Sequence, residues 1–357
     1  MVRVCGPYAE PMSSPLGLPL SVLDLAPVSE GATAAQALRN TLELAPLVER
    51  LGFTRYWVAE HHNMPGIASS APAVLLAHIG SVTSTIRIGS GGVMLPNHAS
   101  LVVAEQFGML EALHPGRVDL GIGRAPGTDQ LTARALRRTP NPQDQVDQFP
   151  EQLVELFGYF DGRWPVGHPF APITATPGLG YRPAIWLLGS SDYGAHAAGV
   201  MGLPYSFAHH FASGNTMVAA QTYRDSFRPV GDLAAPYLML GVSVVCADTD
   251  EHARWLAGPG ALAFLRLRQG RPGKYPTPEQ AASYDYTPWE RAAADDRLRS
   301  AIIGSPATVR AGLAELAQRT GADELMITTM VHAHADRVRS YELVAEVAGL
   351  AQVVTTG

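Results

Sequence analysis

The chain has 357 residues, of which 46% are hydrophobic and 16% are charged, and its formal net charge is −6 at pH 7. These values are typical of a folded globular protein and argue against a disordered chain, a membrane protein or a nucleic-acid-binding protein, which would need a basic surface. With only Cys5 and Cys246, the chain lacks the cysteines of a secreted disulfide scaffold, so we expect a protein of the reducing cytoplasm.

Apolar segments with strand-like and helix-like spacing alternate from residue 18 onward. Residues 1–17 lack the continuous apolar segment of a signal peptide, and we expect them to form a flexible N-terminal arm before a single domain at 18–357. The predicted strands are, in chain order, 18–25, 55–59, 87–93, 117–122, 184–188, 205–208, 237–245 and 324–328. The predicted helices are 33–51, 71–82, 101–113, 152–160, 192–201, 216–227, 249–266, 306–320 and 335–351.

Two segments interrupt this alternation. Residues 128–150 are polar and contain proline, which predicts a long loop, and residues 269–299 are rich in charge, tyrosine and proline. We interpret 269–299 as an insertion between the seventh and eighth strands. Eight strands separated by helices, most of them apolar on both faces, favour a closed (β/α)8 TIM barrel. An open doubly wound sheet is the alternative, but no G-x-G-x-x-G motif follows the first strand.

Glycines stand at the ends of the third and fourth predicted strands, as Gly91-Gly92 and Gly123. Two consecutive glycines remove both side chains, so that a planar ring can lie against the main chain, and such a pair can also adopt a cis peptide bond. A tight exit from the strand would explain the pair equally well.

Polar residues gather at the predicted carboxyl-terminal ends of the strands, where a TIM barrel forms its active site. Ser190 and Ser191 precede a helix and offer hydroxyl and N–H groups to an anion, although simple N-capping explains them equally well. Arg124, at a neighbouring strand end, would add a matching positive charge. With the glycines, these residues predict a site for the phosphate and the ring of a cofactor.

Glu60, His61 and His62 follow the second predicted strand. Imidazole titrates near neutral pH, so one histidine could donate or accept a proton beside the ring, with Glu60 orienting it. Neighbouring residues of an extended segment point to opposite faces, so the sequence does not decide which histidine faces inward.

The chain resembles the luciferase-like monooxygenases, a flavin-dependent superfamily that includes the bacterial luciferase subunits. The resemblance is carried by the segments WVAEHHN, IGSGGVMLPNHASLVVAEQFGMLEALHPGRVDLGIGRAPGTD and LGSSDYGAHAAGVMGLPYSFAHHF, and it extends over nearly all of the chain from Leu18. Within the superfamily the chain is most similar to single-component-like bacterial enzymes, some of which tailor polyketides.

This resemblance implies a barrel that binds reduced FMN (FMNH2) and reacts with O2 through a flavin C4a-(hydro)peroxide. A separate NAD(P)H:flavin reductase would supply FMNH2, and oxygen would enter a small organic substrate, such as an aromatic polyketide of antibiotic biosynthesis, by hydroxylation or epoxidation. The helix at 101–113, with Glu105, resembles the family's subunit-pairing helix, so a homodimer is expected.

The resemblance also implies roles for single residues. Gly91-Gly92 match a pair whose cis peptide lies beneath the isoalloxazine ring, and His61 matches the candidate general base. Arg124 and Ser190 match phosphate contacts, and Asp129 matches an acidic residue near the flavin. The expected catalytic residues are Glu60, His61 and His62, and the expected cofactor-binding residues are Gly91, Gly92, Gly123, Arg124, Asp129, Gly189, Ser190 and Ser191, with no metal site.

Three departures from the family pattern qualify these expectations. Gly123 stands where luciferase has a reactive cysteine, so light emission from an aldehyde is not expected. Gly189 and Tyr193 replace a glutamate and a threonine of the phosphate site, so phosphate affinity should be modest. Residues 269–299 match a mobile loop, which we interpret as a lid that keeps water from the flavin.

Three alternative functions remain open at this point. The same fold could bind deazaflavin F420 and transfer hydride, although only scattered arginines are present to hold the F420 tail. A metal-dependent barrel hydrolase could use His332 and His334, because an H-x-H motif at a strand end places both rings on one face. A flavin-binding relative without catalytic activity is the third.

Overall fold

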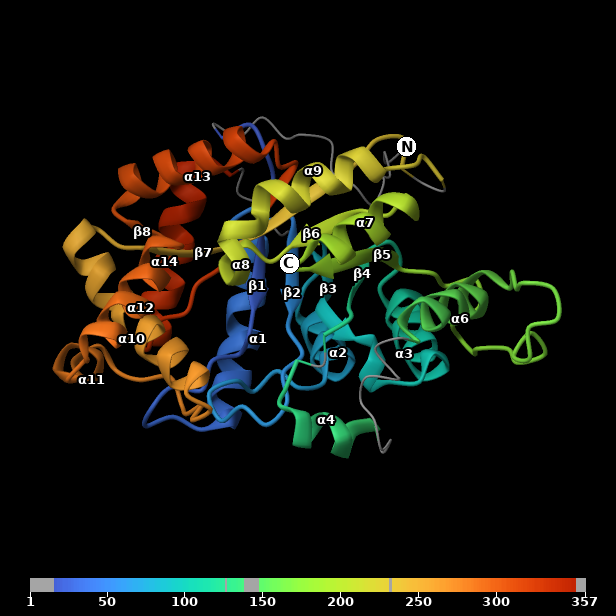
Figure 1. The fold of residues 1–357 in the computed structure, drawn as a ribbon, viewed down its shortest axis with the longest axis horizontal. Helices are drawn as coiled ribbons and strands as arrows, with labels where there is room; N and C mark the ends of the chain where they lie inside the picture. The colour runs from blue at the N-terminus through green and yellow to red at the C-terminus, as the bar shows by residue number, and fades with distance from the viewer. Residues whose placement is uncertain (1–15, 126, 138–147, 231–232, 351–357) are drawn as a thin grey trace.

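Eight parallel strands close into a ring in the order β1-β2-β3-β4-β5-β6-β7-β9, because β9 pairs with both β7 and β1 (Figure 1). The computed structural model describes residues 16–350 except 126, 138–147 and 231–232. The barrel strands are β1 (Leu20–Asp24), β2 (Arg55–Val58), β3 (Arg87–Met94), β4 (Val118–Gly123), β5 (Ala184–Gly189), β6 (Tyr205–Phe207), β7 (Leu238–Cys246) and β9 (Glu324–Thr328). The predicted TIM barrel is therefore confirmed.

Helices surround the strands in Figure 1 and connect most of them. They are α1 (Ala34–Arg50), α2 (Pro72–Val82), α3 (Ser100–Leu113), α4 (Gln130–Arg137), α6 (Phe149–Asp161), α7 (Asp192–Val200), α8 (His209–Ala212), α9 (Thr216–Ser226), α10 (Asp250–Arg268), α11 (Pro278–Ser283), α12 (Pro288–Arg299), α13 (Pro306–Thr320) and α14 (His334–Ala348), with short 3-10 turns at Leu95–Asn97 and Ser213–Asn215. Among the described helices, none is long and apolar enough to cross a membrane.

All eight predicted strands and all nine predicted helices are present within a few residues of the predicted bounds. Two differences from the predicted elements are present. The region 128–150, expected to be a loop, contains α4. The second difference is β8 (Ile302–Gly304), a three-residue strand that pairs with Val244–Cys246 at the end of β7, outside the closed ring. Its shortness explains why no periodic pattern announced it.

The insertion at 269–299 is folded and packs against α10, as the element order and Figure 1 show. Its two helices begin with capping boxes, in which Thr277 pairs with Gln280 and Thr287 pairs with Glu290. Proline follows each capping threonine, at a position where its missing N–H costs nothing. The insertion is therefore a defined structure against the barrel, whereas the first fifteen residues of the predicted arm lie outside the described residues.

The apolar core has two parts that follow from the alternation of side chains along each strand. Outward-facing residues of the strands pack against the surrounding helices in one large cluster. Inward-facing residues fill the barrel with a second cluster in which Trp57 and Trp186 meet edge to face, with ring centroids 5.3 Å apart. Large aromatic side chains therefore fill part of the barrel interior.

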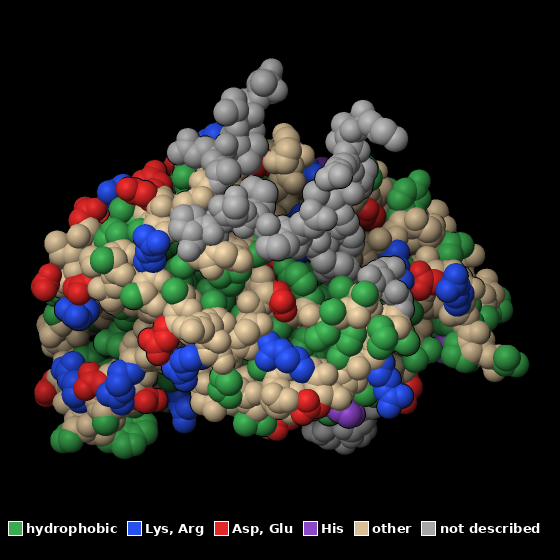
Figure 2. Space-filling model, turned by 90° about the horizontal axis from the view of Figure 1, so that it is seen from above, with side chains coloured by type: hydrophobic (Ala, Val, Ile, Leu, Met, Phe, Trp, Pro, Cys, Tyr) green, Lys and Arg blue, Asp and Glu red, His purple; other side chains and the backbone are tan. Residues whose placement is uncertain are grey.

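Figure 2 shows acidic and basic side chains interspersed over one face of the molecule. This mixed pattern agrees with the small net charge of the chain. The described residues of that face therefore form no continuous basic surface that could bind a polyanion such as nucleic acid.

Candidate active site

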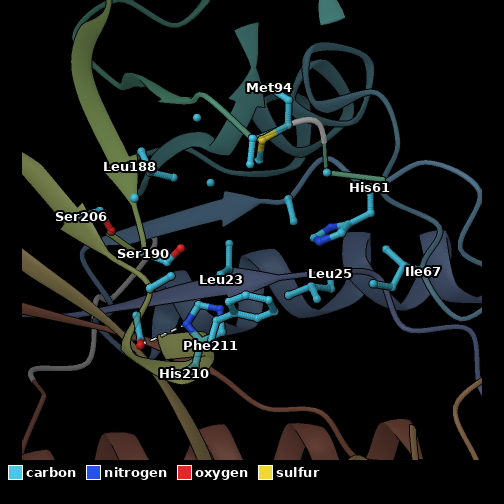
Figure 3. A pocket seen from close by; sticks show the side chains of 18 of the residues that line it. Leu23, Leu25, His61, Ile67, Met94, Leu188, Ser190, Ser206, His210 and Phe211 are labelled. Atoms are coloured by element: carbon cyan, nitrogen blue, oxygen red, sulfur yellow. Dashed lines mark hydrogen bonds between the residues drawn. The ribbon is translucent and has the colours of Figure 1, made fainter. Parts of the chain in front are cut away.

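A cavity of about 700 Å³ lies at the carboxyl-terminal ends of the barrel strands (Figure 3). Leu23 and Trp57, both inward-facing core residues, form part of its floor. The described lining is mainly apolar, and its basic side chains are two arginines and two histidines, Arg124, Arg297, His61 and His210. No aspartate or glutamate is among the described lining residues. The cavity is therefore suited to an apolar ligand that carries negative charge.

Glu60 lies fully buried behind the cavity wall and holds several loops together. Its Oε1 accepts hydrogen bonds from His62 Nε2 at 2.9 Å, His98 Nε2 at 3.0 Å and Asn97 Nδ2 at 3.1 Å, and its Oε2 accepts one from the Met94 N–H at 3.0 Å. Burial raises the pKa of Glu60, but the hydrogen bonds from His62 and His98 outweigh it and lower this pKa to about 2. Glu60 is thus a permanently charged support for the loop after β2.

His61 is the histidine that faces the cavity, whereas His62 turns back to Glu60 (Figure 3). The backbone N–H of His61 donates to the Ser69 carbonyl at 3.0 Å, which fixes the start of the loop. Among the described residues, no group hydrogen-bonds to the buried Nδ1 of His61. Burial lowers the pKa of His61, so its ring is neutral at neutral pH and free to exchange a proton with a ligand.

The Gly91–Gly92 peptide bond is cis, within a β3 strand that continues to Met94. The pairing of β3 with β4 shifts register between Gly91 and Val93. Gly91 lines the cavity, and a Cβ there would lie 2.6 Å from Leu23 Cδ1, so a larger residue would require the Leu23 side chain to move. Gly92 faces away, where a Cβ would lie 2.8 Å from the Gly121 carbonyl oxygen.

Arg124, Ser190, Ser191 and Gly189, all predicted to bind a phosphate, come together along one side of the cavity. The Arg124 guanidinium stacks on the Tyr193 ring, 3.9 Å from its centroid. Ser191 occupies the position before α7, but its side chain makes no capping hydrogen bond. Two exposed hydroxyls, a helix N-terminus and an arginine thus face the same space, which is the arrangement that a phosphate requires.

Gly123 and Asp129, the remaining predicted cofactor residues, have different positions. Gly123 lines the cavity, and a Cβ there would lie 2.8 Å from Met94 Sδ, a flexible side chain that points into the cavity (Figure 3). Asp129 is exposed and does not line the cavity. Its carboxylate accepts hydrogen bonds from the Thr132 N–H and hydroxyl and from Asn63 Nδ2, at 2.6–3.0 Å, so it caps the start of α4.

The histidines of the hypothetical metal site do not form one. His332 Nε2 donates to the Glu30 carbonyl at 3.1 Å, and His334 lies 3.8 Å from the Glu43 carboxylate. Over the described residues, no group of three or more histidines, cysteines and acids is arranged to hold a metal ion.

Three polar residues that line the cavity have no role in the predicted site: His210, Tyr275 and Arg297. His210 follows the sixth predicted strand, so the sequence does indicate its place at a strand end. Tyr275 and Arg297 lie in the insertion, where no strand end or motif gives their position. Of four apolar residues that the sequence suggests as lining, Phe211 and Met330 line the cavity, whereas Phe207 and Trp289 do not.

The family model for luciferase-like monooxygenases matches residues 18–324 of this chain. The chain belongs to the luciferase-like monooxygenase family. A protein of Escherichia coli K12 named luciferase-like monooxygenase is 44% identical over 327 residues, which cover 92% of this chain and 96% of the relative. The N-acetyl-S-alkylcysteine monooxygenase of Bacillus subtilis is 36% identical over 329 residues, covering 92% of this chain and 97% of that protein.

Solved structures of similar proteins agree with this family assignment. The crystal structure of apo-MsnO8 is 38% identical and superimposes with a TM-score of 0.84, covering 94% of this chain and all of that one. The oxygenating constituent of 3,6-diketocamphane monooxygenase, a type II Baeyer-Villiger monooxygenase in complex with FMN, is only 19% identical, with a TM-score of 0.67 over 93% of this chain and 98% of that one. This second likeness shows the common fold alone.

The cavity of this luciferase-like monooxygenase fits a flavin on three observations. Its volume is within the range of cofactor sites. His61 Nδ1 is buried at its wall without a described partner, as expected for an atom that binds a ligand. Arg124 has no acidic partner among the described residues and stands beside free hydroxyls. The residues expected at the ring, Gly91 and His61, and those expected at the phosphate, Arg124, Ser190 and Ser191, all line this one cavity.

Proposed function

We propose that this protein is an FMN-dependent monooxygenase that uses FMNH2 and O2 to oxygenate a small organic substrate. The observation that carries the proposal is the cavity itself, in which a neutral histidine, a side-chain-free strand segment and a phosphate-like corner border one space. Reduced FMN, when bound, would supply the activation of O2, since the side chains of the cavity cannot do so.

The protein's own residues would then control protons and water. His61, whose neutral ring lines the cavity, would accept a proton from the substrate or return one to the product. Glu60 would keep the His61-His62 loop in place through its hydrogen bonds to His62 and the Met94 N–H. The insertion supplies Tyr275 and Arg297 to the lining, and we propose that it serves as a lid that excludes water.

Two observations suggest candidate substrates for this enzyme. The mainly apolar lining suits an aromatic or other apolar body, and hydroxylation or epoxidation of an aromatic polyketide is one such reaction. The relative named N-acetyl-S-alkylcysteine monooxygenase adds N-acetyl-S-alkylcysteines as a second group of test substrates.

Binding and turnover test this proposal separately. Photoreduced FMN should bind under anaerobic conditions with a micromolar or lower Kd, and admission of O2 should yield an oxygenated product, detected by mass spectrometry with 18O2, from at least one compound of these two groups. The same titration with F420 is the comparison: binding of F420 and failure to bind FMN would overturn the proposal in favour of hydride transfer.

We further propose that the enzyme is a cytoplasmic homodimer supplied with FMNH2 by a separate NAD(P)H:flavin reductase. Exposed apolar side chains lie on α2 and α3, including Val74 at 63%, Met109 at 53% and Leu113 at 65% exposure. Light scattering should give twice the chain mass, and Met109→Glu should lower it to the chain mass. A wild-type protein that scatters as a monomer would contradict the homodimer.

A further inference from the structure

Arg297, on α12, brings a second positive charge to the cavity. Its Nη1 donates to the backbone carbonyl of His210, and its guanidinium lies 5.1 Å from the Phe264 ring centroid. Burial lowers the pKa of Arg297, and no aspartate or glutamate among the described residues compensates it. A part-buried guanidinium with spare N–H donors and no carboxylate is costly unless a ligand supplies the negative charge.

His210 lies next to Arg297 and offers a hydrogen-bond acceptor, whereas Arg297 offers donors. Its Nδ1 lies 3.0 Å from the Gly241 carbonyl, and because a carbonyl can only accept, the proton is on Nδ1 and the lone pair is on Nε2. Burial lowers the pKa of His210 to about 4, so the ring is neutral at neutral pH. The ring has room because residue 241 is glycine: a Cβ there would lie 2.7 Å from His210 Nδ1.

This pair is separate from the proposed phosphate corner. Arg124 follows β4 and stacks on Tyr193 of α7, whereas Arg297 contacts His210, which follows β6. Figure 3 shows the rings of His61 and His210 entering the cavity from different sides. A flavin whose phosphate lies at Arg124 would therefore leave Arg297 to another ligand.

We propose that Arg297 binds an acidic oxygen group of the organic substrate, a carboxylate or a phenol, and that His210 Nε2 accepts a hydrogen bond from the same substrate. A phenol would use both residues, with its oxygen accepting from Arg297 and its O–H donating to His210. A carboxylate would use Arg297 alone. Phe211, Phe264, Leu267 and Met330 line the cavity and would surround the apolar body of either substrate. This inference rests on the proposed function, because it places the substrate beside the flavin.

The test compares acids with neutral molecules of the same shape on the FMN-loaded protein. The probes are 3-phenylpropionate against 3-phenylpropanamide, and 4-ethylphenol against 4-ethylanisole, with Kd measured by calorimetry. At least one acid should bind about tenfold more tightly than its neutral partner. 3-Phenylpropionate gains a charge-assisted hydrogen bond from Arg297, and 4-ethylphenol gains an O–H that donates to His210. Equal binding within both pairs would overturn the inference.

Three variants and one control assign the preference to its residue. Arg297→Gln should abolish the preference for the carboxylate, and Arg297→Lys should keep part of it. Arg299→Gln is the matched control: this arginine is on the same helix, is 69% exposed and pairs with Asp296, so its loss should change nothing. Gly241→Ala, which displaces the His210 ring, should weaken binding of the phenol and leave that of the carboxylate unchanged, and so identifies the acid.

Flavin binding separates this inference from the proposed function. Wild type and Arg297→Gln should prefer FMN over riboflavin to the same extent. Loss of that preference in Arg297→Gln would overturn the inference, because Arg297 would then bind the flavin phosphate. Failure of the wild type to bind FMN would instead refute the proposed function.

Discussion

The two ends of the barrel use buried charge in opposite ways. At the amino-terminal ends of the strands, Arg55 Nη1 lies 2.9 Å from Asp119 Oδ2 and Arg55 Nε lies 3.0 Å from Glu324 Oε1, with all three side chains fully buried. At the carboxyl-terminal ends, Arg124 and Arg297 face a cavity without carboxylates among its described lining residues. Charges that compensate each other stabilise a fold, whereas uncompensated charges of one sign prepare a binding site.

Removing a charge should therefore have different consequences at the two ends. At the amino end it should cost stability and leave ligand binding intact. At the cavity it should cost little stability and change binding or turnover. Each variant below tests one side of this difference.

The largest effect is expected for Asp119→Ala at the amino end. This substitution leaves Arg55 and Arg87 buried or part-buried without their shared partner and removes the acceptor of Trp57 Nε1. We expect a loss of about 3–5 kcal/mol in the free energy of unfolding, measured by urea denaturation. Removing the half-exposed carboxylate of Asp161, which pairs with Arg182 at 3.4 Å, should cost less than about 1 kcal/mol. Equal losses would contradict the comparison.

Glu60 is an exception at the carboxyl end, because it is buried and fully hydrogen-bonded behind the cavity. Its pKa is about 2 when folded against an ordinary value of 4.5, so its stabilisation is complete above pH 4.5 and is lost as the pH falls toward 2. The expected loss is about 3 kcal/mol over that interval. In Glu60→Gln this part of the pH dependence should disappear, as thermal melts between pH 2 and pH 5 would show; an unchanged profile would contradict the assignment.

His61 should matter for turnover and hardly for stability. Its ring lines the cavity, so His61→Asn should lower kcat by roughly a hundredfold, the usual contribution of a general acid or base. The free energy of unfolding and the FMN affinity should stay near those of the wild type. His62→Asn is the control, since His62 faces Glu60 and not the cavity. A larger loss of kcat in the control would refute the role of His61.

The smallest effect is expected at the phosphate corner. Arg124 is part-buried and stacks on Tyr193, so Arg124→Gln should weaken FMN binding by roughly tenfold and leave riboflavin binding unchanged. Fluorescence titration with both flavins measures the difference. An equal effect on FMN and riboflavin would place the phosphate elsewhere.

The barrel and one side of the site could be predicted from the sequence, and particular residues show why the rest could not. The spacing of apolar residues, with glycine or proline at the ends of a segment, predicts strands such as 87–93 without tertiary information. Residues that follow a strand directly, such as His61 and Arg124, take their position from the barrel, and both line the cavity at the strand ends. Asp129 belongs to a loop, where its carboxylate caps α4 and does not reach the cavity.

Residues of the insertion were beyond prediction for a different reason. Tyr275 and Arg297 reach the cavity only because α12 packs against α10 and the chain returns over the barrel mouth. No local sequence pattern predicts this tertiary packing. The pair Gly91-Gly92 illustrates the remaining limit: the sequence indicated a cis peptide, but only the coordinates show that Gly91 alone faces the cavity.

The most direct test of the account is anaerobic titration of reduced FMN into the wild type, Ala59→Phe and Val166→Phe, followed by calorimetry. Ala59 is buried in the cavity wall, whereas Val166 is fully exposed in the segment after α6. The account predicts one saturable site per chain in the wild type and in Val166→Phe, and its loss in Ala59→Phe, whose new ring would occupy the cavity. No saturable binding to the wild type, or undiminished binding to Ala59→Phe, would contradict it.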